Sequence, residues 1–201
     1  MENEPLIDKA LKTELSALYR AGDRHYHNLT HIEAMLALAG DYRGLLSDPD
    51  AVEAAIWFHD AIYDSKAKDN EAQSAALAET RLAGRGDAGR LDRISAMILA
   101  TATHQLPRFE DAAAMRDASL FLDMDLSILG AAPAAFDAYE RAVRREYDWV
   151  EEPMWRAGRA AVLKAFLARQ HIFHTEEFRR RFEPQAKLNM ARSLEALEGS
   201  T

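Results

Sequence analysis

Residues 54–64 read AAIWFHDAIYD, a strongly apolar segment that carries the adjacent polar pair His59 and Asp60. The segment does not alternate polar with apolar residues, and its length fits a buried helix better than a strand. Burying the pair costs several kcal/mol unless something compensates it. A divalent cation, which binds imidazole nitrogen and carboxylate oxygen together, would do so. A plain hydrogen bond between the two side chains would also do so.

Helical spacing continues on both sides of this segment. Apolar residues recur at intervals of three and four in the stripe Leu6, Ile7, Leu11, Leu15 and Leu18, and again in Ile94, Met97, Ile98 and Ala102. No stretch shows the period of two that is typical of a half-buried strand. The pattern predicts an all-α protein, a bundle of helices in a single domain.

Capping residues and glycines predict where the helices begin and end. Asp48 before Pro49 is typical of a helix start, and the prolines at 153 and 184 are further candidate starts. Gly22, Gly40, Gly84 and Gly130 follow periodic runs, as helix-ending residues do. The predicted helices cover residues 5–20, 28–39, 49–63, 70–83, 88–103, 113–129, 134–148, 153–173, 175–182 and 185–197.

The length and composition favour one domain over residues 1–201. A chain of 201 residues with 48% hydrophobic residues is long enough to bury one substantial core, and no linker-like stretch interrupts it. Within that domain, the polar clusters predict a metal-binding core at about residues 24–130. A helical extension is predicted at about residues 134–198.

Charge and cysteine content narrow the range of partners. The formal net charge of -8 disfavours nucleic acid, whose phosphates attract basic faces. The chain has no cysteine, so any metal site must use His, Asp or Glu. The acidic start and the lack of a long apolar run predict a cytoplasmic protein with no membrane partner. A homodimer is left open.

Histidines gather in the segment RHYHNLTHI at residues 24–32. His27 and His31 are four residues apart, so a helix that begins near Asn28 would direct both toward one side. An isolated histidine at a helix start is more often a hydrogen-bonded residue than a ligand. Three histidines within seven residues weaken that interpretation.

A third polar cluster lies in the segment LFLDMDLSILG at residues 120–130. Asp123 and Asp125 interrupt an otherwise apolar helix and point to different sides of it, so one of them is expected to reach a given ion. The other could orient a ligand histidine. We favour Asp125 as the ligand, with Asp123 as the alternative.

The order His, His-Asp, Asp along the chain resembles the HD-domain superfamily of metal-dependent phosphohydrolases. The segment YHNLTH at 26–31 resembles the signature of cyclic-nucleotide phosphodiesterases, and the set that includes residues 58–64, 69–74, 102–104 and 123–126 resembles a small bacterial family of predicted HD phosphohydrolases. The chain lacks the nucleotide-binding C-terminal region of the phosphodiesterases. A cyclic nucleotide is therefore not implied as the substrate.

The resemblance implies a helical fold and one metal ion held by His31, His59, Asp60 and an aspartate near 125. It also implies that His27 donates a proton to the leaving oxygen. The ion would be Mn, Mg, Co, Zn or Fe, and it would activate water against a phosphoryl group. Arg24 is a candidate clamp for the phosphate, although a solvated surface charge is an equal alternative.

Glu71 and His104 are candidates for a second metal site or for substrate contacts. For Glu71, an acid in the first turn of a helix is the slightly preferred interpretation. The predicted function is hydrolysis of a small phosphorylated molecule, such as a nucleotide, a phosphomonoester, a pyrophosphate or a phosphodiester. The alternatives are an HD-fold di-iron oxygenase and a non-catalytic module that binds a nucleotide as a regulator.

Overall fold

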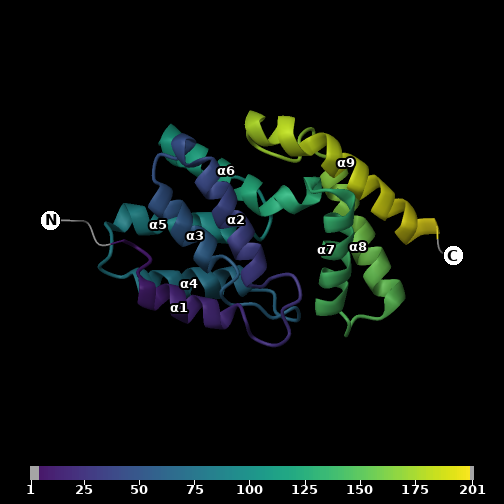
Figure 1. Cartoon of the computed structure of the whole chain (residues 1–201), viewed down its shortest axis with the longest axis horizontal. Coiled ribbons are helices and arrows are strands. Elements are labelled where there is room, and N and C mark those ends of the chain that lie inside the picture. The colour runs from purple at the N-terminus through teal and green to yellow at the C-terminus, as the bar shows by residue number, and fades with distance from the viewer. Residues whose placement is uncertain (1–4, 200–201) are drawn as a thin grey trace. The chain divides into compact units, whose positions relative to one another are not determined.

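The computed structural model of the chain describes residues 5–199 and is helical, with no strand over that range (Figure 1). The prediction of an all-α protein is confirmed. Over the same residues no single helix is long and apolar enough to cross a membrane, although one bent pair, Ala112–Gly130 with Pro133–Glu146, passes that test by length and composition alone.

The helices follow one another with short connections. In chain order they are α1 (Lys9–Leu18), α2 (Leu29–Asp41), η1 (Arg43–Leu45), α3 (Pro49–Phe58), α4 (Asn70–Leu82), α5 (Ala88–Ala100), α6 (Ala112–Leu126), η2 (Ser127–Gly130), α7 (Pro133–Glu146), α8 (Glu152–Leu167) and α9 (Glu176–Gly199), where η marks a short 3₁₀ helix.

Short polar side chains start several of these helices. Asp8, Asn28, Asp48 and Asp87 each accept a hydrogen bond from a main-chain N–H in the first turn that follows. Pro49 occupies the first turn of α3, as its fixed φ favours. The predicted start at Asp48 is confirmed.

The first helix that needs correction is the one predicted over 49–63. Helix α3 ends at Phe58, and residues 59–64 form turns. Main-chain groups of these turns bond to α4: Ser74 Oγ accepts a hydrogen bond from the Ile62 N–H, and Asn70 Oδ1 accepts one from the Asp64 N–H. These distant partners replace the hydrogen bonds that a continued helix would make.

The C-terminal predictions need two further corrections. The predicted break at Pro184 is wrong, because α9 runs from Glu176 to Gly199 with this proline inside it. Helix α8 ends at Leu167 rather than at 173, and the side chain of Glu183 accepts a hydrogen bond from the N–H of Ile172 in the segment that follows. Contacts made by folding overrode the local signals at both places.

Two compact units divide the chain, Met1–Met124 and Asp125–Thr201. The boundary falls inside the continuous helix α6. The sequence placed the end of the core near residue 130, a few residues later. The prediction of a single domain stays a prediction.

Helix α3 lies at the centre of the first unit. It contacts α1, α2, α4 and α5, and every residue of Ala51–Phe58 except Glu53 is buried. This explains its nearly continuous apolar sequence, because a helix covered on all sides has no polar face. The polar pair at 59–60 follows immediately after this buried helix.

The second unit is organised around α9, which contacts η2 and α8. Asn189 of α9 is buried and donates through Nδ2 to the carbonyls of Leu129 and Ala131. Its hydrogen bonds satisfy carbonyls that the end of η2 would otherwise leave unpaired.

Candidate metal centre

The first histidine segment folds as a turn that leads into α2. Asn28 caps this helix: its Oδ1 accepts a hydrogen bond from the Thr30 N–H at 2.9 Å. His31 lies in the first turn of α2 and is 7% exposed, whereas His27 precedes the cap. The rings of the two histidines are 6.4 Å apart between centroids. The start of α2 near Asn28 and the nearness of His27 to His31 agree with the prediction.

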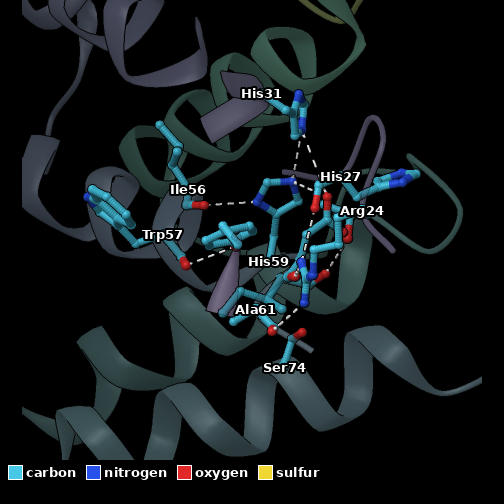
Figure 2. A network of polar contacts seen from close by, with 12 residues as sticks. Arg24, His27, His31, Ile56, Trp57, His59, Ala61 and Ser74 are labelled. Atoms are coloured by element: carbon cyan, nitrogen blue, oxygen red, sulfur yellow. Dashed lines mark hydrogen bonds and ion pairs between the residues drawn. The ribbon is translucent and has the colours of Figure 1, made fainter. Parts of the chain in front are cut away.

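The second histidine lies at the end of α3 and is 1% exposed. The Nδ1 atom of His59 lies 3.0 Å from the carbonyl oxygen of Ile56, one turn earlier in the same helix (Figure 2). A carbonyl accepts and never donates, so Nδ1 carries the proton in this contact. In the neutral ring Nε2 then has a free lone pair, as a metal ligand requires.

The donor atoms of the two helices converge. His59 Nε2 lies 3.3 Å from His31 Nε2, a contact drawn as a dashed line in Figure 2. Asp60 brings Oδ2 to 3.1 Å from His59 Nε2 and to 3.9 Å from His31 Nε2. Three of the four predicted ligands therefore lie together.

The fourth ligand comes from α6. His31, His59 and Asp125 offer ligand atoms that all lie within 4.8 Å of one another, so this largely buried group could hold a metal ion. Asp125 is one residue past the boundary of the first unit, on the same continuous helix as Met124. Asp123, the alternative, is fully buried on that helix.

The carboxyl group of Asp60 is held in its ionised form. Burial acts to raise its pKa. The charges of His59 and then His27, together with a hydrogen bond from His59, lower that pKa by more, so the net shift is well below the ordinary value. An anionic oxygen beside two imidazole nitrogens is a donor set that suits a divalent cation.

Arg24 lies close to these residues, but its guanidinium bonds to the main chain. It donates to the carbonyls of His27, Asp60 and Ala61. The prediction that it clamps a phosphate stays a prediction. What the geometry establishes is a connection between the turn before α2 and the turn after α3.

Tyr63 is a residue of the site that sequence analysis passed over. Its ring stacks on that of His27, with centroids 4.3 Å apart and planes at 25°. Tyr26 packs in turn beside His31, at 4.9 Å between centroids. Both tyrosines stand in the quoted polar segments, where their aromatic character alone gave no sign of these contacts.

Glu71 and His104 occupy helix ends. Glu71 lies in the first turn of α4, which agrees with the preferred interpretation of a helix-start acid. His104 follows α5 with a φ of 51°, in the left-handed region that residues other than glycine rarely adopt. Roles for these two residues in a second metal site or in substrate contacts stay predictions.

A cavity of about 410 Å³ lies on the other side of the Arg24 segment. It is lined by Tyr19, Arg20, Ala21, Gly22, Arg24, Asn28, Leu29, Thr30 and Glu33. None of the four predicted metal ligands is among these residues. The cavity therefore borders the segment that carries His27 without containing the metal cluster.

Comparisons with known protein families, with curated proteins and with solved structures found no match.

Proposed function

We propose that this protein is a metal-dependent hydrolase of the HD-domain type that acts on a small phosphorylated molecule. The observation that carries the proposal is the convergence of His31 Nε2, His59 Nε2 and Asp60 Oδ2, with mutual distances of 3.1 to 3.9 Å. Asp125 completes a set of two imidazoles and two carboxylates.

The spacing of these donor atoms fits a shared ion. Nitrogen and oxygen ligands bind zinc at about 2.0–2.2 Å, so donors at 90–110° around one ion lie roughly 3.0–3.6 Å apart. The observed distances match or slightly exceed this range. The four residues named above would hold the ion, and a set of four protein donors leaves room for further ligands on an ion that takes six.

The chain's own residues supply orientation and a proton. The bond from His59 Nδ1 to Ile56 keeps Nε2 aimed at the cluster. His27, beside His31 and held against Tyr63, is placed to give a proton from its ring to a leaving oxygen. A divalent ion, when bound, supplies Lewis acidity and a lowered pKa for water.

The test combines metal content with turnover. The protein is purified without added metal or chelator and its metals are measured, and turnover is then assayed on nucleotides and on mono-, di- and pyrophosphate esters with Mn, Mg, Co or Zn supplied singly. The proposal expects about one ion per chain and phosphate release that depends on it. Two bound irons without phosphate release would instead favour the di-iron oxygenase. Bound metal with nucleotide binding but no turnover would favour the regulatory module.

A further inference from the structure

The side chain of Arg24 bonds to both halves of the candidate metal centre. Nη1 donates to the carbonyl of His27 at 3.1 Å and to that of Asp60 at 2.6 Å, and Nη2 donates to the carbonyl of Ala61 at 2.8 Å. Figure 2 shows the guanidinium beneath the cluster, in the same view as His31 and His59. One side chain thus joins residues that are 36 and 37 positions away to its own turn.

Two aromatic rings flank the same guanidinium. Its central carbon lies 5.1 Å from the ring centroid of Tyr19 and 5.7 Å from that of Tyr63. Cation–π contacts at this range add to the hydrogen bonds and favour one orientation of the planar group. Tyr63 is also the ring stacked on His27, so the guanidinium and the imidazole share a neighbour.

The other anchors of residues 60–64 lead elsewhere. Ser74 and Asn70 attach the Ile62 and Asp64 main chain to α4. Neither reaches the turn before α2. The bonds of Arg24 are the ones that tie the Asp60 segment to the segment of His27 and His31.

We propose that Arg24 is a positioning residue that sets the spacing of the metal ligands. Its loss would leave two or three carbonyls without their donor and release the Asp60 turn from the start of α2. The distances between the donor atoms would then vary, and an ion would have to order them as it binds. This inference rests on the proposed metal site but not on the substrate or on catalysis.

The fork shape of the guanidinium makes the proposal specific. A lysine at position 24 keeps the charge, but its single ammonium cannot present a planar fork to three carbonyls and two rings. Arg24→Lys and Arg24→Gln should therefore both weaken metal binding. A residue that only binds a phosphate would instead raise the KM for substrate and leave metal affinity unchanged.

Arg144 offers a matched control in the second unit. Its guanidinium donates to the carbonyls of Tyr147 and Val150 and lies 5.3 Å from the ring centroid of Trp155. Arg144→Lys and Arg144→Gln thus break the same kind of carbonyl clamp far along the chain from the histidines. They report the cost of losing such a clamp for folding alone.

The experiment titrates Mn²⁺ into the metal-free full chain and its variants by calorimetry, with thermal unfolding measured alongside. Loss of an outer partner of a metal ligand commonly costs about 10–100-fold in affinity, and we expect that loss for both Arg24 variants and for neither Arg144 variant. Arg24 variants that bind Mn²⁺ as tightly as the wild type, or that lose no more than the Arg144 variants, would overturn the proposal.

A second measurement needs no metal. Histidine side-chain ¹⁵N spectra of the metal-free protein report the tautomer and environment of each ring, and Arg24→Gln should shift the signals of His27 and His59 while Arg144→Gln leaves them in place. Unchanged signals would count against the positioning role even if wild-type protein bound no ion. Failure of the proposed function would appear separately, as a wild-type protein without metal-dependent turnover.

Discussion

The Nε2 atoms of His31 and His59 face each other at 3.3 Å, although the residues are 28 positions apart in the chain. Both side chains are almost fully buried. Because His59 directs Nδ1 at the carbonyl of Ile56, its Nε2 is an acceptor in the neutral ring. Two acceptors at this distance repel unless a proton or a cation lies between them. A metal ion would satisfy both nitrogens and the neighbouring Asp60 carboxylate.

Substitution of the two aspartates in α6 should separate a metal ligand from its neighbour. Asp125→Asn removes a carboxylate that lies with His31 and His59, and we expect it to lower Mn²⁺ affinity more than about 100-fold, beyond the usual effect of an outer partner. Asp123→Asn should cost about 10–100-fold at most. Calorimetric titration of metal-free protein measures both.

Thermal unfolding of the metal-free variants provides the control for this comparison. Asp123 is fully buried, so its substitution alone can lower stability without any effect on an ion. If Asp123→Asn lost as much affinity as Asp125→Asn at matched temperatures below unfolding, the assignment of Asp125 as the ligand would be wrong.

Replacement of His27 should separate chemistry from metal binding. His27 is close to His31 but is assigned a proton rather than a ligand bond. General acid catalysis is worth about 10²–10⁴-fold, so His27→Asn should lower kcat by that order while metal content stays near the wild-type value. Turnover equal to that of the wild type would remove the proton-donor role, and loss of the metal would make His27 a ligand.

The central helix shows how far the sequence predicted the fold. The run from Ala51 to Phe58 predicted a buried helix correctly, and Asp48 with Pro49 predicted its start. Its end at Phe58 was not predictable from local signals, since no glycine or proline follows. The helix stops where Ser74 and Arg24 bond to residues 60–62. Propensity cannot register partners that folding brings from other helices.

The candidate site divides in the same way. The residue types and their burial cost predicted His31, His59 and Asp60, which the structure brings together. The stacking of Tyr63 on His27 has no sequence signature, because it depends on the turn after α3 meeting the turn before α2. The carbonyl bonds of Arg24 depend on that same meeting, and main-chain acceptors look alike at every residue.

The ion pair between Asp48 and Arg90 predicts a pH dependence of stability. Arg90 donates to both carboxylate oxygens, and the Ala51 N–H donates to one of them. Burial raises the pKa of the Asp48 carboxyl, but the bonds from Arg90 and Ala51 lower it by more, and the net pKa is below its ordinary value. The folded state therefore resists protonation, so this stabilisation is complete above about pH 4 and is lost as the pH falls through the folded-state pKa.

Urea unfolding across the pH range measures this contribution. Asn is also a good N-cap, so Asp48→Asn removes the charge while keeping the cap, and Asp48→Ala removes both. At pH 7 we expect losses of about 0.5–1.5 kcal/mol for the Asn variant and about 1–3 kcal/mol for the Ala variant. The gap between wild type and Asp48→Asn should narrow toward pH 3. A gap that stayed constant would show that the charge of Asp48 contributes nothing.

Two glycines of the second unit should respond to alanine in opposite ways. A Cβ built on Gly130 would lie 2.6 Å from the Cβ of Phe182 and would also meet the main chain of that residue in α9, so the backbone would have to shift. Overpacking of this kind costs about 1–3 kcal/mol. A Cβ on Gly158, inside α8, would meet nothing within 4 Å, and alanine there should stabilise by about 0.4–1 kcal/mol because it restricts the unfolded chain. The free energy of unfolding of Gly130→Ala and Gly158→Ala tests both signs, and a Gly130→Ala variant as stable as the wild type would mean that η2 does not pack against Phe182.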